Sequence, residues 1–208
     1  MAIGSRQCAG ELIEWNSDAW RAATEHPFLA GVREGTLDPA RFAAWLGQDY
    51  LFAGALLSFQ ARLLARAPRT AQPTLVRGAG ALVDELAWFE AQAAQRGLSL
   101  AAVPAPSTLE YLALLGRLDT SPTPVALVAL WALERVYRDA WQSAAPGAEP
   151  YREIVAHWTE PGFTDYVAAL EHLADTALTD FPSAEQQTVF DEVLRLEIAF
   201  WDAGTATG

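Results

Sequence analysis

Helical periodicity runs through nearly all of this 208-residue chain and limits the folds open to it. Apolar residues recur three and four positions apart, which is the spacing of one face of an α-helix. Proline, glycine and capping residues mark the breaks, and no stretch alternates with a period of two for long enough to form a strand. The sequence therefore predicts an all-α protein, a single-domain bundle of about seven to eight helices.

Two start signals and one break define the clearest helix ends. Asp38 followed by Pro39 is a strong helix start, and Ser107 with Glu110 has the spacing of a capping box. The segment 26–28 (His-Pro-Phe) ends the first helix, and we expect a short turn from there to Gly35. The predicted helices span residues 11–25, 39–67, 70 or 74 to 97, 107–118, 121–144, 151–157, 163–178 and 182–203.

The length of the chain is sufficient for one domain with a sizeable core. We expect that domain at residues 9–203, followed by a disordered tail at 204–208. The longest apolar runs are too short to span a bilayer, and no signal-peptide pattern opens the chain. These features predict a cytoplasmic protein with no membrane partner.

Charge and cysteine content exclude further classes. The formal net charge is −12 and lysine is absent, whereas binding to nucleic acid needs clustered basic residues. A nucleic-acid partner is therefore not expected. Cys8 is the only cysteine and precedes the first predicted helix, so we expect neither a disulfide nor a catalytic thiol.

Three carboxylates stand among aromatic and aliphatic residues on predicted helix faces. Asp49 shares a face with Trp45, Glu134 shares one with Tyr137, and Glu197 lies in an otherwise core-like helix. A charged group in a core is costly unless it is paired or used. The alternatives are a solvent-facing Asp49 and a purely structural Glu134–Tyr137 hydrogen bond. Together the three predict a small pocket with aromatic walls, in which a buried Glu197 would suit acid/base chemistry.

A metal site is not predicted. Di-iron bundles use Glu-x-x-His pairs on facing helices, and none of His26, His157 and His172 lies three residues after a glutamate. Glu153 and His157 are four apart but have no second such pair. We therefore expect no metal and no cofactor, and we interpret His26 as a hydrogen-bonding group at a helix end. Glu85 is either solvated or a contributor to the pocket.

The segments that carry these residues resemble, in order along the chain, the TenA (thiaminase II) family. That family has the haem-oxygenase-like helical fold, and the resemblance extends from Glu11 to Trp201. Each match is short, but the ordered set is fairly specific. The matching segments are 26–28, 35–37 with Phe42, 48–50, 130–141, 157–158 and 197–201.

The resemblance implies an aminopyrimidine aminohydrolase of thiamin salvage, with a small-molecule aminopyrimidine as its substrate. Such an enzyme hydrolyses 4-amino-5-aminomethyl-2-methylpyrimidine to the hydroxymethyl-pyrimidine, and the N-formyl derivative is left open as a further substrate. Asp49 would hold the amidine edge of the ring, Glu197 would be the main acid/base and Glu134 a second carboxyl. The expected substrate-binding residues are Asp49, Phe52, Tyr111, Tyr137, Trp158 and Glu85.

One departure from the family concerns the nucleophile. The better-studied branch carries a cysteine on the helix that here reads Val125–Trp131, and Ala129 or a neighbour stands in its place. The chain is similar to the branch in which a glutamate takes the central role, so efficient cleavage of thiamin is not expected.

Two other functions remain open. One is a haem-oxygenase-like oxygenase or oxidase, which the small number of histidines disfavours. The other is a non-catalytic pyrimidine-binding regulatory protein, in which the missing cysteine marks lost activity. The resemblance also implies a homodimer or homotetramer.

Overall fold

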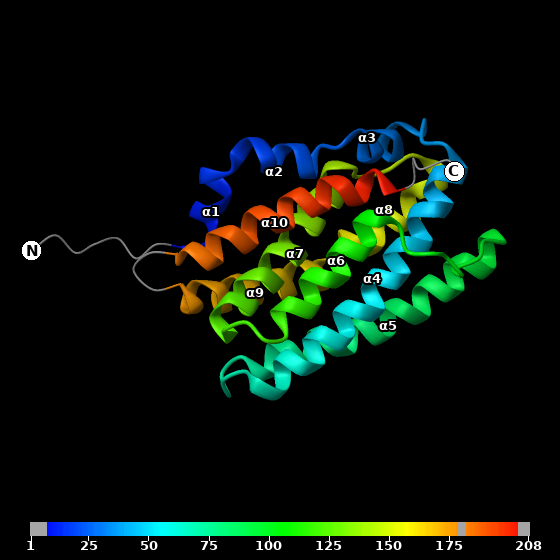
Figure 1. Ribbon diagram of the computed structural model, residues 1–208. Helices are drawn as coiled ribbons and strands as arrows, with labels where there is room; N and C mark the ends of the chain where they lie inside the picture. Colours follow the sequence, from blue (N-terminus) through cyan, green and yellow to red (C-terminus); the bar gives the residue numbers. More distant parts are fainter. Residues whose placement is uncertain (1–7, 179–181, 204–208) are drawn as a thin grey trace, which may run out of the picture. The chain divides into compact units, whose positions relative to one another are not determined.

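The computed structural model describes residues 8–178 and 182–203, and this part of the chain contains helices and no strand (Figure 1). The all-α prediction is confirmed. The helices are α1 (Ala9–Trp15), α2 (Ser17–Thr24), α3 (Pro27–Glu34), α4 (Pro39–Arg66), α5 (Gln72–Arg96), α6 (Pro106–Leu118), α7 (Thr123–Ser143), the 3-10 helix η1 (Glu149–Tyr151), α8 (Arg152–Trp158), α9 (Pro161–Ala177) and α10 (Ala184–Trp201).

The chain divides into two compact units. Unit 1 contains the residues up to Gly35 and Pro122–Ile198, and unit 2 contains Thr36–Ser121 and the residues from Ala199. Helix α10 contributes to both, because the boundary falls after Ile198. The single domain expected over residues 9–203 stays a prediction, and the tail expected at 204–208 lies outside the described residues.

Helix α7 is the centre of unit 1. Every residue from Val125 to Glu134 is buried, and α7 packs against α2 and α9. Trp131 stacks on Phe190 of α10 at a ring-centroid distance of 5.9 Å, and Phe190 in turn stacks on Trp20 of α2 at 6.0 Å. The first half of α7 is apolar on all sides because other helices surround it.

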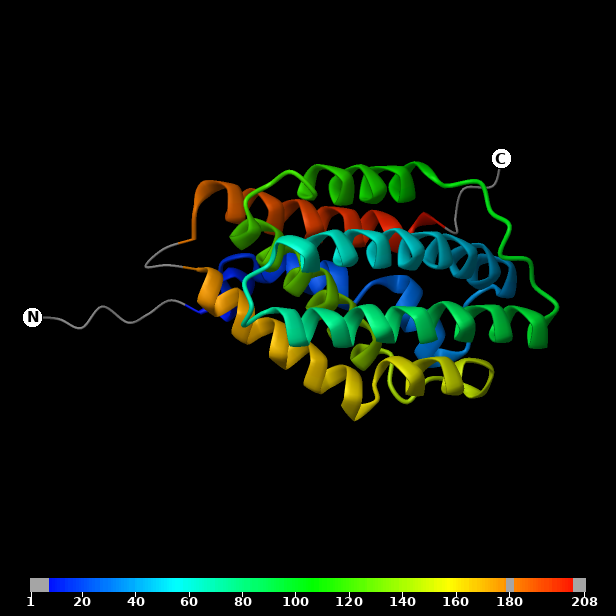
Figure 2. The same cartoon turned by 90° about the horizontal axis from the view of Figure 1, so that it is seen from below.

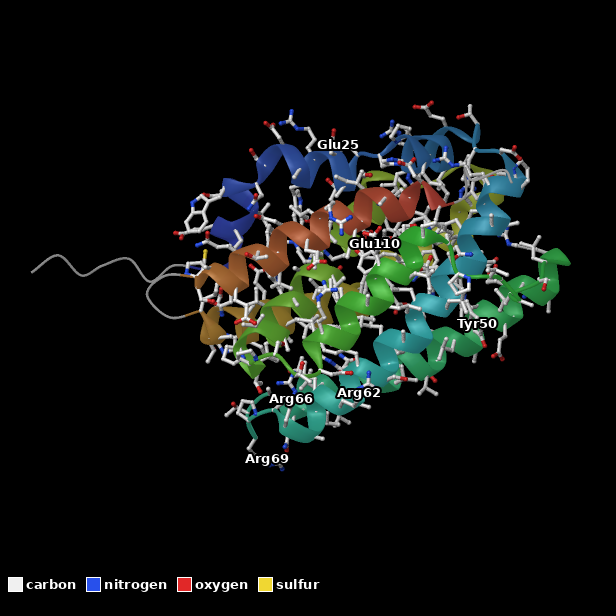
Figure 3. The ribbon with its side chains drawn as sticks, in the orientation of Figure 1. Glu25, Tyr50, Arg62, Arg66, Arg69 and Glu110 are labelled. Carbon is white, nitrogen blue, oxygen red and sulfur yellow. The ribbon has the colours of Figure 1, made fainter. Side chains whose placement is uncertain are left out.

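Unit 2 is built on the long helix α4, which lies side by side with α5 in both views (Figures 1 and 2) and also packs against α6. Arg66, labelled in Figure 3, donates from one guanidinium nitrogen to the carbonyl of Leu118 at 2.7 Å and from the other to that of Ser121 at 2.6 Å. These bonds satisfy the carbonyl of Leu118, the last residue of α6, and the carbonyl of Ser121 in the connector that follows.

Local sequence determines where three of the helices begin. Asp38 caps α4 as predicted, its Oδ1 accepting from the Ala40 backbone N–H at 2.8 Å. The α10 start is a reciprocal box, in which Ser183 Oγ accepts from Gln186 N and Gln186 Oε1 accepts from Ser183 N. The capping box predicted at Ser107 is wrong: α6 begins at Pro106 with Ala105 before it, because proline at the first helical position already sets the start.

The N-terminal region differs most from the prediction, and its extra helices raise the number in the described residues above seven or eight. The predicted helix 11–25 is interrupted at Asn16, whose φ of −114° and ψ of 28° are not helical. The expected turn after His26 is instead helix α3. Pro27 starts this helix rather than merely ending the previous one, since its fixed φ suits the first helical position.

None of the helices in the described residues is long and apolar enough to cross a membrane.

Candidate functional site

The predicted site residues fall into two groups, which lie in different units. Unit 1 holds Glu134 and Tyr137 on α7, Trp158 on α8 and Glu197 on α10. Unit 2 holds Asp49 and Phe52 on α4, Glu85 on α5 and Tyr111 on α6.

Both carboxylates of unit 1 are buried. Glu134 is 8% exposed and Glu197 4%, and each stands on a helix whose neighbouring residues form the core. Burial of an ionised carboxyl without compensating interactions costs on the order of several kcal/mol. Two such groups are therefore expected to have specific polar partners or a chemical role. The predicted Glu134–Tyr137 hydrogen bond stays a prediction.

Tyr137 and Trp158 belong to one aromatic cluster of unit 1. Their ring centroids are 5.5 Å apart with the planes at 84°, an edge-to-face arrangement. Trp141 completes the cluster, lying 4.5 Å from Trp158 and 6.1 Å from Tyr137. Two aromatic residues from α7 thus meet one from α8, which the sequence could not show because the approach of α8 to α7 depends on tertiary packing.

The second aromatic cluster belongs to unit 2 and brings Phe52 and Tyr111 together. Their rings are 4.8 Å apart, and Phe200 lies 5.9 Å from Phe52 and 5.6 Å from Tyr111. Phe200 was not among the predicted site residues. A signal was present, since Phe200 follows Glu197 by three positions in α10 and such residues share a helix face.

Asp49 is 3% exposed on α4, so the alternative in which it faces solvent is wrong. Trp45, one helical turn earlier, is fully buried and stacks on Trp201 at 5.9 Å. The three-and-four spacing of Trp45, Asp49 and Ala53 therefore does mark a buried face of the helix.

Gln48, next to Asp49, makes an extended hydrogen-bond network that sequence reasoning missed. Its Oε1 accepts from the Ala105 backbone N–H at 2.8 Å and from the Thr108 hydroxyl at 2.7 Å. Its Nε2 donates to the Val103 carbonyl at 3.1 Å. Gln48 thus fixes the connector and the first turn of α6, the helix that presents Tyr111 to Phe52.

The acidic residues Glu85 and Glu90 of α5 are more exposed to solvent than Asp49, Glu134 and Glu197. Glu90 is exposed and accepts a hydrogen bond from the Tyr50 hydroxyl at 2.9 Å. This bond, together with desolvation and the Glu90 charge, raises the pKa of Tyr50 above its ordinary value of 10.0. Glu85 is half-buried, and its role at the pocket stays a prediction.

Two of the histidines make contacts with residues close to them in sequence. His26 Nδ1 accepts from the Phe28 backbone N–H at 3.2 Å and caps α3, as the helix-end interpretation expected. His157 packs edge-on against Trp158 at 5.6 Å. Within the described residues, no three His, Cys, Asp or Glu side chains gather as a metal-binding group would require.

Known proteins are similar in sequence to this chain over most of its length. The model of the TENA/THI-4/PQQC family matches residues 16–206. A soybean (Glycine max) protein named a probable bifunctional TENA-E protein is 30% identical, with 88% of this chain and 86% of that protein covered. The aminopyrimidine aminohydrolase of Halalkalibacterium halodurans is 25% identical, with 93% of each chain covered.

Solved structures agree with the sequence matches. The crystal structure of a TenA homologue from Pyrococcus furiosus has a TM-score of 0.87 and 29% identity, covering 94% of this chain and 98% of that one. A Shewanella denitrificans domain with a haem-oxygenase-like fold has a TM-score of 0.75 at 15% identity, over 97% of this chain and 93% of that one. The fold is therefore that of the haem-oxygenase-like helical proteins. The chain belongs to the TENA/THI-4/PQQC family.

Proposed function

We propose that this protein is an aminopyrimidine aminohydrolase of thiamin salvage that works through carboxylates. The observation that carries the proposal is the burial of Asp49, Glu134 and Glu197 on helix faces rich in aromatic residues. The aminohydrolase named among the relatives supports the reaction class. The absence of cysteine after Cys8 leaves no thiolate on α7 and favours glutamate chemistry.

Glu197 is the proposed acid and base. Protonation of the amine on the 5-methylene lets the C–N bond break with departure of ammonia, and a water oxygen then bonds to the methylene carbon. The proton lost by that water returns to the carboxylate, so the enzyme ends in its starting state. A buried glutamate suits the first half, because burial favours the neutral acid that it needs, and the carboxylate left after that transfer is the base for the second half.

Asp49 is the proposed anchor for the aminopyrimidine ring. A carboxylate accepts from the amino group of the amidine edge in a charge-assisted hydrogen bond, which fixes the ring orientation. The aromatic residues proposed to bind the flat heterocycle are Phe52, Tyr111, Tyr137 and Trp158. Glu134 is the proposed second carboxyl, and Glu85 a further polar contributor.

The substrate is tested by mass spectrometry of the purified protein incubated with thiamin, with the aminomethyl-pyrimidine and with its N-formyl derivative. We expect hydroxymethyl-pyrimidine from the aminomethyl compound and little or none from thiamin. Product from the N-formyl compound would add a deformylation step. If no compound is converted, the aminohydrolase proposal is wrong.

A further inference from the structure

Helix α6 begins without a side chain of its own to cap it. Its N-cap residue is Ala105, which makes no side-chain capping bond. The first N–H groups of a helix have no partner inside the helix. For α6 a partner comes from α4, where Gln48 Oε1 accepts from the Ala105 N–H at 2.8 Å and from the Thr108 hydroxyl at 2.7 Å. One side chain of α4 thus holds the first turn of α6.

Helices α4 and α6 meet again one turn further along. On α4, Phe52 follows Gln48 by four residues, and on α6 a tyrosine follows the bonded threonine by three. Residues with this spacing share a helix face. The rings of Phe52 and Tyr111 are 4.8 Å apart at an angle of 64°. The same two faces therefore make a hydrogen bond at one turn and an aromatic contact at the next.

Two contacts one turn apart on the same pair of helix faces are mechanically coupled. We propose that Gln48 is a positioning residue for substrate binding, which acts through Thr108 and Tyr111. The bond to Thr108 fixes the rotation of α6 about its axis, and that rotation sets the angle of the Tyr111 ring against Phe52. The inference rests on the proposed function, in which these two rings bind the pyrimidine.

The bond between Gln48 and Thr108 is shielded from water. Thr108 is 0% exposed and Gln48 is 7% exposed. A rotation of α6 that broke the bond would leave the buried Thr108 hydroxyl without its acceptor, and a buried polar group without a partner is costly. The bond therefore favours a single rotation of α6.

The connector before α6 is held against α4 next to the same glutamine. Gln48 Nε2 donates to the Val103 carbonyl at 3.1 Å. A Cβ added at Gly47 would lie 3.1 Å from the Ala102 Cβ, so the absence of a side chain lets the connector approach α4 this closely. Because the connector is held at two neighbouring points, the start of α6 has little freedom to shift along α4.

Tyr111 is the residue through which a rotation of α6 would affect the substrate. It is 1% exposed, and its ring also stands at 88° to that of Phe200, 5.6 Å away. Edge-to-face aromatic contacts depend on ring orientation. A rotation of α6 would therefore move the Tyr111 ring against both of its neighbours and change the aromatic surface that a flat heterocycle meets.

Steady-state kinetics of two Thr108 variants with the aminomethyl-pyrimidine tests this role. Thr108→Val keeps the shape of the side chain but loses the hydroxyl, so KM should rise by about tenfold while kcat stays within about twofold of wild type. Thr108→Ser keeps the hydroxyl and should have a KM close to that of wild type. Helical circular dichroism should be unchanged in both variants. An unchanged KM in Thr108→Val, or an equal rise in both variants, would overturn the proposal.

A fluorine resonance from Tyr111 tests the position of the ring without turnover. The chain has five tyrosines, so fluorotyrosine labels each of them, and Tyr111→Phe identifies the resonance of Tyr111 by its loss. That resonance should shift in Thr108→Val and stay near its wild-type position in Thr108→Ser. An active wild type whose Tyr111 resonance does not shift in Thr108→Val would overturn the positioning role alone. A wild type that converts none of the three compounds would overturn the proposed function, and with it the role in substrate binding.

Discussion

Several polar residues of this molecule are buried, and their hydrogen bonds show which of them have a structural role. The side-chain amide of Gln48 hydrogen-bonds to three groups of the connector and α6. These bonds explain why a polar side chain is buried at this position. Asp49, its neighbour in sequence, could be predicted as buried from helical spacing alone. Gln48 could not be assigned in the same way, because its partners lie more than fifty residues further along the chain.

Replacing Gln48 with leucine should destabilise the protein by about 2–4 kcal/mol, because the Ala105 N–H and the Thr108 hydroxyl would lose their buried acceptor. Urea unfolding followed by circular dichroism measures this loss. Gln48→Glu keeps an acceptor for both donors and is the comparison. Equal stability of Gln48→Leu and wild type would show that the network contributes nothing.

Asp49→Asn should raise KM for the aminomethyl-pyrimidine by about tenfold to a hundredfold, since a neutral amide replaces a charge-assisted hydrogen bond. Steady-state kinetics gives KM and kcat separately. Asp191→Asn, at an exposed position of α10, is the control and should leave both constants unchanged. An unchanged KM in Asp49→Asn would remove this residue from substrate binding.

At the scale of elements, long helices follow from sequence and short ones depend on context. Helical periodicity extends over seven turns of α4, and the Asp38–Pro39 start and the end predicted at residue 67 agree with its limits to within a residue. Helix α3 has only eight residues, too few to display a pattern, and the proline that starts it has the same appearance as one that ends a helix. Contacts between elements, such as Trp141 against Trp158, depend on packing that one sequence does not reveal.

The two serines with capping-box spacing provide a matched pair. Ser183→Ala should cost about 1 kcal/mol, because it removes the reciprocal bonds with Gln186 at the start of α10. Ser107→Ala should cost less than about 0.5 kcal/mol, because Ala105 rather than Ser107 precedes α6. Urea unfolding of both variants checks the order, and a larger loss from Ser107→Ala would contradict it.

The Tyr50–Glu90 bond between α4 and α5 predicts a dependence on alkaline pH. Since the folded state raises the pKa of Tyr50 above 10.0, its contribution to stability is fully present below that pH and is lost as the pH rises through the raised value. The difference in stability between wild type and Tyr50→Phe should therefore shrink above pH 10.0. Urea unfolding at a series of alkaline pH values measures it, and a constant difference would argue against the bond.

At the scale of the whole molecule, membership of the TENA/THI-4/PQQC family is the basis for the proposed role of the buried carboxylates. The chain has acidic and aromatic residues at the positions that the family resemblance indicates, and that resemblance implies Ala129 or a neighbour in place of the thiol of the other branch. The fold class and the burial of Asp49, Glu134 and Glu197 could be predicted because they depend on helix faces, whereas the roles of these residues stay predictions. The helical spacing of Phe200 from Glu197 was visible in the sequence, but its contacts with Phe52 and Tyr111 depend on tertiary packing.

The central claim is that Glu197 supplies the acid/base chemistry, and the rate of ammonia release from the aminomethyl-pyrimidine tests it most directly. Glu197→Gln keeps the shape of the side chain but removes its proton transfer, so kcat should fall by about 10²–10⁴-fold with the helical circular dichroism unchanged. Glu185→Gln, at an exposed position of the same helix, should retain the wild-type rate. A Glu197→Gln variant that releases ammonia at the wild-type rate would contradict the claim.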